Sequence, residues 1–166
     1  MKKLLMIALL VAPMTVFAQK FGHVNTQAVI QSLPDFIKAN GEIESQAKIY
    51  ENELQTMQQE IQTQAAAYEQ AAATMSATQK EAKEKELNEM YQKVQQTYQD
   101  NQQALQKMQQ DKLQPILTKV QNAIQNVGKA GGYVYIMDTS AGIPYISDTL
   151  SKDVTAEVKA EINKLK

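Results

Sequence analysis

The chain has 166 residues, enough for one domain, and its charge is nearly balanced, with 17 lysines, no arginine and 18 acidic residues. The lack of cysteine excludes disulfides and thiolate chemistry, and the lack of a basic excess argues against nucleic-acid binding. A glutamine-rich chain without tryptophan forms long helices more easily than a compact core, so we expect burial at seams between helices and between subunits.

Residues 1–18 have the three parts of a secretory signal. Lys2 and Lys3 precede a short apolar run, and Ala18 supplies the small residue at the expected cleavage site. The alternative is a membrane anchor, but the run of about nine residues is shorter than the roughly 20 that a spanning helix needs. We predict cleavage after Ala18, which leaves 15 lysines against 18 acidic residues and a net charge of −3.

The segment after Gln19 predicts a strand at 21–25 and a short helix at 27–32. Pro34 then marks a helix start, because proline is tolerated in a first turn. His23 is the chain's one histidine, and no ligand partner stands near it at metal-site spacing, so we expect a structural or surface role and no metal site.

Residues 35–127 predict two long helices folded back on each other, with the turn near 74–79. The alternative is one uninterrupted helix of about 90 residues. The first helix has apolar residues at heptad spacing, with one extra four-residue step that locally unwinds the supercoil. The predicted seam consists of Ile43, Ala47, Tyr50, Leu54, Met57, Ile61, Ala65, Tyr68, Ala72 and Met75.

The second helix predicts a matching seam with slips. Thr78 with Glu81 fits a capping box at its start. Pro115 predicts a kink, with a break into two helices as the alternative. The predicted seam consists of Leu87, Tyr91, Val94, Tyr98, Asn101 or Gln102, Leu105, Met108, Leu113, Ile116, Val120, Ala123 or Ile124, and Val127.

The end of the chain predicts a small sheet and a closing helix. Gly128 is a candidate left-handed cap of the long helix. Residues 133–137 predict a strand, 138–142 a turn, 143–147 a second strand and 153–165 a helix.

We therefore expect a mainly α fold with a small β base, in which 19–34 and 128–166 form the base and 35–127 the arm. Three short strands and one small helix cannot bury themselves against a single arm, so the base should assemble into an oligomer. Its candidate contact residues are Val134, Ile136, Ile143 and Ile146.

The motifs of enzymes are missing from the pattern. There is no Gly-rich phosphate loop, no paired histidine ligands and no serine in a strand–turn–helix context. Residues 80–86 alternate lysine and glutamate as a solvated helix face does. We expect no catalytic residues and no cofactor.

Three segments together with the order of elements carry a resemblance. They are 113–117 with the following apolar seam, 132–138, and the closing segment 151–158. On these segments the chain resembles the Skp/OmpH family of periplasmic chaperones. The resemblance implies a homotrimer in the periplasm, with a β-barrel base built from three subunits. Three helical arms would enclose unfolded outer-membrane proteins without ATP and prevent their aggregation.

The arm charge departs from this family, whose better-known members are strongly basic. Between residues 42 and 69 the first arm helix carries six glutamates against Lys48 alone: Glu42, Glu44, Glu51, Glu53, Glu60 and Glu69. Lys80, Lys83 and Lys85 are weak candidates for contact with lipopolysaccharide, each with a neighbouring glutamate. At most a weak contact with outer-membrane lipid is expected.

Candidate client-facing residues on the arm are Tyr68, Met75, Met90 and Tyr91, because methionine adapts to many partners. The alternative is that all four only hold the hairpin together. The alternative function is a structural coiled coil that serves as a spacer or scaffold in the cell envelope.

Overall fold

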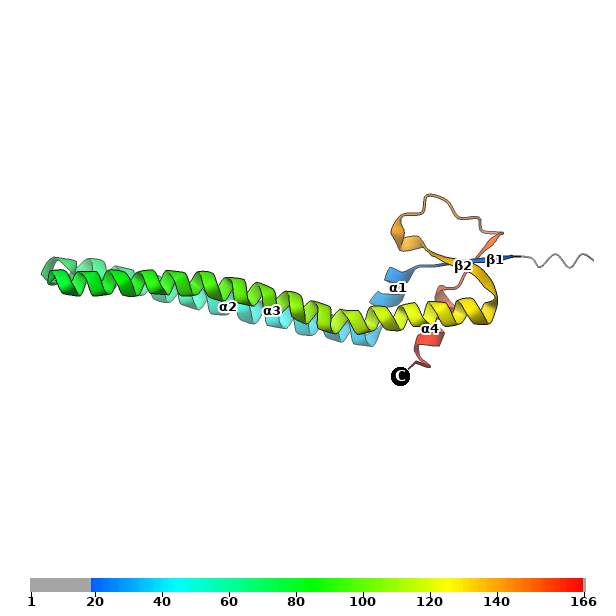
Figure 1. Ribbon diagram of the computed structural model, residues 1–166, viewed down its shortest axis with the longest axis horizontal. Coiled ribbons are helices and arrows are strands. Elements are labelled where there is room, and N and C mark those ends of the chain that lie inside the picture. Colours follow the sequence, from blue (N-terminus) through cyan, green and yellow to red (C-terminus); the bar gives the residue numbers. More distant parts are fainter. Residues whose placement is uncertain (1–18, 166) are drawn as a thin grey trace, which may run out of the picture. The chain divides into compact units, whose positions relative to one another are not determined.

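A computed structural model describes residues 19–165, so the predicted leader and its cleavage site lie outside the described residues. The chain forms two compact units. We call residues 19–26 with 122–165 the base unit, and residues 27–121 the arm unit. The fold is mainly α with a small sheet, as predicted (Figure 1).

The arm unit is a helical hairpin, as predicted. The short helix α1 (Thr26–Gln31) leads to α2 (Pro34–Ala71), which has proline in its first turn. A 3-10 turn, η2 (Ala72–Thr74), then leads to α3 (Ala77–Gly131), which runs back along α2 (Figure 1). The 38 residues of α2 span about 57 Å at 1.5 Å per residue.

The capping box at the start of α3 lies two residues before the predicted one. The Ser76 N–H donates to Gln79 Oε1 over 2.9 Å, and the Gln79 N–H donates to Ser76 Oγ over 3.4 Å. The prediction of Thr78 with Glu81 was wrong, although both pairs fit the motif. The backbone is extended at Met75, so Ser76 lies at the N-cap position of α3.

Helix α3 continues through Pro115, so the alternative of a break there was wrong, and the predicted kink stays a prediction. The helix also continues past Gly128, which was the predicted cap. At the end of this helix it is Gly132 that has the left-handed conformation, at φ +67°. A Cβ on the preceding Gly131 would lie 2.3 Å from the Tyr133 ring, so a larger residue there would force this ring to move.

The sheet in the base unit has three parallel strands in the order β2-β1-β3. The strands β1 (Lys20–Val24) and β2 (Tyr133–Asp138) were predicted, and β3 (Ser151–Asp153) was not. The predicted strand at 143–147 was wrong, because these residues lie in a loop after the 3-10 turn η3 (Thr139–Ala141). This loop contains Ile143 and Ile146, whose role as contact residues stays a prediction. Pro144 has no N–H for a ladder, and β3 takes the place beside β1 instead.

The closing helix α4 (Thr155–Ile162) packs on β1 and, together with its N-cap residue, contributes to the core of the base unit. Val154, Val158 and Ile162 lie on one face, and all three are buried. Val24 of β1 is buried as well. The Asn126 amide in the last turns of α3 donates to the Glu161 carboxylate of α4 over 3.0 Å, which ties these two helices together.

Candidate interaction surfaces

The α2 side of the hairpin seam follows the predicted positions through the extra four-residue step. Ile43 and Ile61 are buried, and every other predicted member from Ala47 to Met75 is half-buried. The heptad pattern of α2 was therefore sufficient to locate its packed face.

The α3 side of the seam differs from the prediction at two tyrosines. Tyr91 is 55% exposed and Tyr98 is also exposed, whereas Met90 and Thr97 are half-buried beside Leu87 and Val94. A step of three or four from Leu87 fits a heptad equally well, so spacing cannot choose between these residues. The packed seam holds the slimmer Met90 and Thr97, and it leaves the large phenol rings in solvent.

Polar contacts cross the seam along the hairpin. The Tyr68 hydroxyl donates to Glu84 over 2.7 Å, and this bond raises the pKa of Tyr68. Further along, the Asn101 amide donates to Glu53 over 3.2 Å. Of the four candidate client-facing residues, Tyr68, Met75 and Met90 are thus half-buried, and Tyr91 is the exposed one.

A cavity of about 320 Å³ lies in the arm unit between α2 and α3. Its apolar side chains are Met57 and Ile61 of α2 and Met90 and Val94 of α3. Three exposed polar residues complete the lining: Thr56, Glu60 and Lys93. Met90 therefore contributes to the seam and to a hollow beside it.

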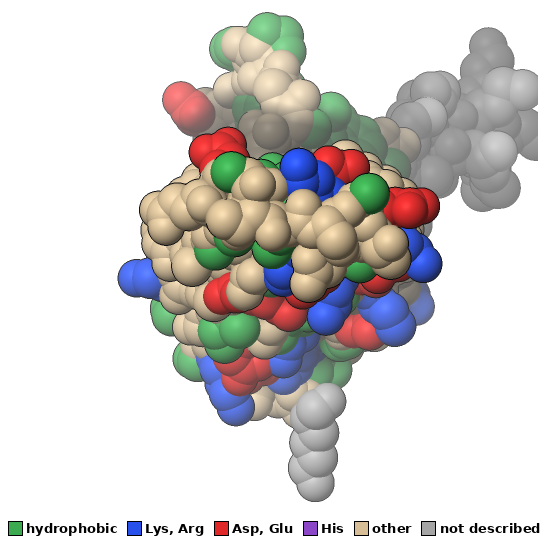
Figure 2. Space-filling view, turned by 90° about the vertical axis from the view of Figure 1, so that its left-hand side faces the viewer, with side chains coloured by type: hydrophobic (Ala, Val, Ile, Leu, Met, Phe, Trp, Pro, Cys, Tyr) green, Lys and Arg blue, Asp and Glu red, His purple; other side chains and the backbone are tan. Residues whose placement is uncertain are grey.

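The lysines near the turn of the hairpin are mostly paired. Lys83 forms an ion pair with Glu86 at 2.7 Å, and Lys85 forms one with Glu89 at 3.7 Å. Figure 2, which views the hairpin end of the molecule, shows lysine and acidic side chains interspersed with polar and hydrophobic ones. This face presents no large cluster of positive charge.

The base unit exposes apolar side chains on both faces of the edge strand β2. Val134 is 58% exposed, and Tyr135 and Met137, which alternate with it, are exposed on the other face. Ile136 is half-buried. The Tyr135 ring stacks on Phe21 with a centroid distance of 4.8 Å. An edge strand with these side chains is suited to contact with another chain.

The loop beside this strand adds a second apolar region. A cavity of about 260 Å³ is lined by Phe21, Tyr135 and Met137 from the sheet and by residues of the loop. Ile146 is half-buried there, and Tyr145 and Leu150 are exposed. The four candidate contact residues therefore lie in two places. Val134 and Ile136 belong to the edge strand β2, and Ile143 and Ile146 belong to the loop.

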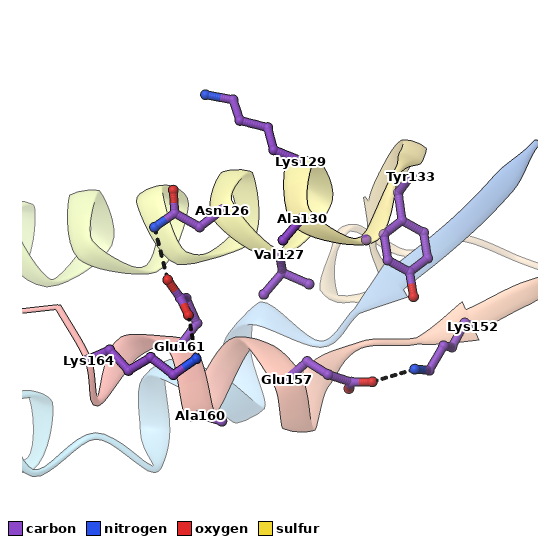
Figure 3. Close-up of a pocket in the computed structure, with 11 residues that line it drawn as sticks. Asn126, Val127, Lys129, Ala130, Tyr133, Lys152, Glu157, Ala160, Glu161 and Lys164 are labelled. Atoms are coloured by element: carbon purple, nitrogen blue, oxygen red, sulfur yellow. Dashed lines mark hydrogen bonds and ion pairs between the residues drawn. The ribbon is translucent and has the colours of Figure 1, made fainter.

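A hollow of about 610 Å³ in the base unit lies between the end of α3 and α4 (Figure 3). Lys152 pairs with Glu157 at 2.6 Å, and Lys164 pairs with Glu161 at 3.0 Å. These lysines lower the pKa of each glutamate. Lys129 points away from the carboxylates in Figure 3. Because the lysines that face the hollow are neutralised, it is not arranged as an anion site.

Polar side chains fasten the ends of the strands. The Asp138 carboxylate accepts hydrogen bonds from the N–H and hydroxyl of Thr26 and from the N–H of Ser140. Burial raises the pKa of Asp138, but these hydrogen bonds outweigh it, and the net pKa lies below the usual range. His23 Nδ1 lies 2.9 Å from Ser151 Oγ, which joins β1 to β3.

In residues 19–165, no group of three or more His, Cys, Asp or Glu side chains is placed to hold a metal ion. No helix in the described part is both long enough and apolar enough to cross a membrane.

Comparison with known protein families identifies the family to which this chain belongs. The model of the family described as outer membrane protein (OmpH-like) matches residues 20–162. The chain belongs to the OmpH-like family. The resemblance seen in the sequence is confirmed.

Its relatives include curated proteins named Chaperone protein Skp. The one from Yersinia enterocolitica is 28% identical over 153 residues, which cover 92% of each chain. The one from Yersinia pestis is 32% identical over 145 residues, which cover 87% of this chain and 86% of the relative. This OmpH-like chain therefore aligns with the Skp proteins over most of its length.

The OmpH-like fold is also seen in a solved structure. An OmpH-like outer membrane chaperone from Caulobacter crescentus CB15 matches with a TM-score of 0.75 at 16% identity, over 88% of this chain and 85% of that one. At this identity the match shows the fold alone.

Proposed function

We propose that the protein is a periplasmic holdase chaperone that binds unfolded outer-membrane proteins and prevents their aggregation without ATP. The observation that carries the proposal is a helical arm, more than 50 Å long by the rise of α2, joined in an OmpH-like chain to a sheet with an apolar edge. The curated relatives named Chaperone protein Skp support it.

The base unit supports assembly into a homotrimer. Val134, Tyr135 and Met137 expose apolar surface on a strand whose outer edge has no partner strand among the described residues. A second copy that covers this edge would bury the side chains and pair the backbone. Closure by three copies would give the small barrel that the resemblance implies. Each copy would then contribute one arm around a shared cavity.

The arm supports a binding mode made of many weak contacts. Tyr91 and Tyr98 lie seven residues apart on one face of α3, and both rings are available to a client. The arm has no excess of positive charge, so its contacts should not rest on attraction to acidic clients. Contact with outer-membrane lipid would be weak for the same reason, since Lys83 and Lys85 are paired with glutamates.

The proposed site of action is the periplasm after removal of residues 1–18. The mature chain would begin at Gln19, which is exposed and directly precedes β1. We infer no enzymatic activity and no cofactor. The function would rest on binding and release of an unfolded chain.

The experiment that tests this function follows light scattering while a urea-unfolded outer-membrane barrel protein is diluted into buffer with residues 19–166. The proposal predicts that scattering is suppressed. Val134→Lys should lose the trimer and most of the suppression. Ile37→Lys is the matched control, because Ile37 is 62% exposed in the arm unit. Absence of suppression by the unaltered protein at large excess would leave the spacer or scaffold function.

A further inference from the structure

The cavity of about 320 Å³ in the arm unit has the composition of a side-chain pocket. Its interior is apolar, with two methionines, one isoleucine and one valine. Ile61 is only 4% exposed, and Met57, Met90 and Val94 are half-buried, so these four lie deepest. The unbranched methionine side chains can adjust to occupants of different shape.

The polar residues around this cavity leave it uncharged overall. Glu60 and Lys93 have opposite charges, and Thr56 is neutral. The Thr56 hydroxyl donates to the Asn52 carbonyl over 2.8 Å, so it makes no demand on an occupant. Such a mouth neither attracts nor repels a client by its net charge. The composition favours one apolar side chain with its neutral backbone.

One exposed apolar side chain, Ile49, lies on α2 about two turns before the cavity. Ile49 is 57% exposed and lies seven residues before Thr56, which places both on the same face of α2. Two helical turns separate these positions by about 10 Å. An extended chain covers that distance in about three residues at 3.3 Å each. A client segment with one apolar side chain in the cavity would therefore place a neighbouring residue on Ile49.

We propose that this cavity is a binding pocket for a single large apolar side chain of an unfolded client in extended conformation, with Ile49 as a second contact. The inference rests on the proposed holdase function and adds a defined site to it. The pocket requires no preferred sequence beyond one leucine-sized or phenylalanine-sized side chain every few residues. Segments of outer-membrane strands, which alternate apolar and polar residues, meet this requirement.

The test fills the pocket with a larger side chain at a residue that lines its opening. In Thr56→Phe the new ring can fold over Met57 and Met90 and occupy the cavity. Thr63→Phe is the matched control, because Thr63 is exposed seven residues further along the same face and its hydroxyl also donates to the carbonyl four residues before it, over 2.9 Å. Both variants should keep the helicity of the unaltered protein, since both positions are exposed.

The measurement is the dissociation constant for a fluorescently labelled, urea-unfolded outer-membrane barrel protein, together with the oligomeric mass. We expect Thr56→Phe to bind about tenfold more weakly or worse, because the client can no longer bury one large apolar side chain there. Thr63→Phe should bind like the unaltered protein. Equal binding by both variants would overturn the pocket and leave the holdase function intact. A changed mass with unchanged binding would identify a second copy as the occupant and overturn it as well.

A second measurement tests the pocket even if Thr56→Phe loses helicity. The chain has no cysteine, so Thr56→Cys and Thr63→Cys each accept one bimane label. Added client should shift the emission of the label at position 56 to shorter wavelength and leave the label at position 63 unchanged. Equal responses at both positions would overturn the proposal. If the unaltered protein bound no client at all, the proposed function would fail with it.

Discussion

Lys112 of α3 forms an ion pair with Glu42 of α2, which joins two residues 70 positions apart in the chain. Both side chains are half-buried. The hydrogen bond from Lys112 lowers the pKa of Glu42. Lys38 also faces Glu42, at 4.0 Å, but it lies one turn away on the same helix. One carboxylate therefore has a partner across the hairpin and a partner within α2.

This arrangement predicts that Lys112→Ala destabilises the hairpin more than Lys38→Ala does. The first change removes a link between two helices, whereas the second removes an exposed pair within one helix, which contributes little. Hydrogen exchange of α2 amides near Glu42 measures the difference, and high salt should reduce it. Equal exchange in the two variants would show that the crossing pair has no special effect.

The turn of the hairpin predicts a second asymmetry. Ser76→Ala removes the side-chain cap of α3 and should cost about 0.5–2 kcal/mol of local stability. Thr78→Ala should cost less, because no capping contact of Thr78 is seen in the described residues. Hydrogen exchange of the first amides of α3 checks both variants. A larger effect at Thr78 would restore the capping box that the sequence alone suggested.

The seam predicts different effects for two apolar residues at similar heights on the hairpin. Ile61→Ala should lower the free energy of unfolding by about 2–4 kcal/mol, because it leaves a hole in a packed seam. Tyr91→Ala should change it by no more than about 0.5 kcal/mol, because the ring is exposed. Urea denaturation of both variants gives the comparison. If Tyr91→Ala proved the costlier change, the exposed position of its ring would be wrong.

The Asp138 carboxylate predicts a loss of stability in acid. Its pKa is lower in the folded chain than in the unfolded chain, so it stabilises the fold above its unfolded pKa. That contribution is lost as pH falls toward the folded pKa. Asp153, whose pKa is lowered by hydrogen bonds from Thr155, acts in the same direction.

Asp138→Asn should therefore be less stable than the unaltered protein at neutral pH, with a smaller difference at pH 3. Thermal unfolding across this range measures it. Asp148→Asn, an exposed change in the loop after η3, is the control and should run parallel to the unaltered protein. A difference between Asp138→Asn and the unaltered protein that stays constant across the range would refute a role for the charge.

The sequence predicts the long elements well because their signals are repeated many times. From Ile43 to Met75 each seam residue supports the next, and Pro34 marks the start of α2. The strand β2 was visible from its run of tyrosines and β-branched residues. The family resemblance lay in segments near the end of the chain, and the family match confirms it.

The short elements were missed because single residues decide them. The strand β3 is Ser-Lys-Asp, which has no apolar alternation. It forms because its backbone pairs with the free edge of β1. Met90 and Tyr91 are adjacent in the sequence and both fit the heptad, so only packing shows which one enters the seam. The cavity beside Met90 arises from two helices together, and neither helix alone gives a signal for it.

Native mass spectrometry tests the central claim most directly. It measures the mass of the complex that residues 19–166 form with one urea-unfolded outer-membrane barrel protein. The account predicts three chains with one client, and three chains alone when no client is added. A protein that stays monomeric and carries no client after dilution from urea would contradict both the trimeric base and the holdase function.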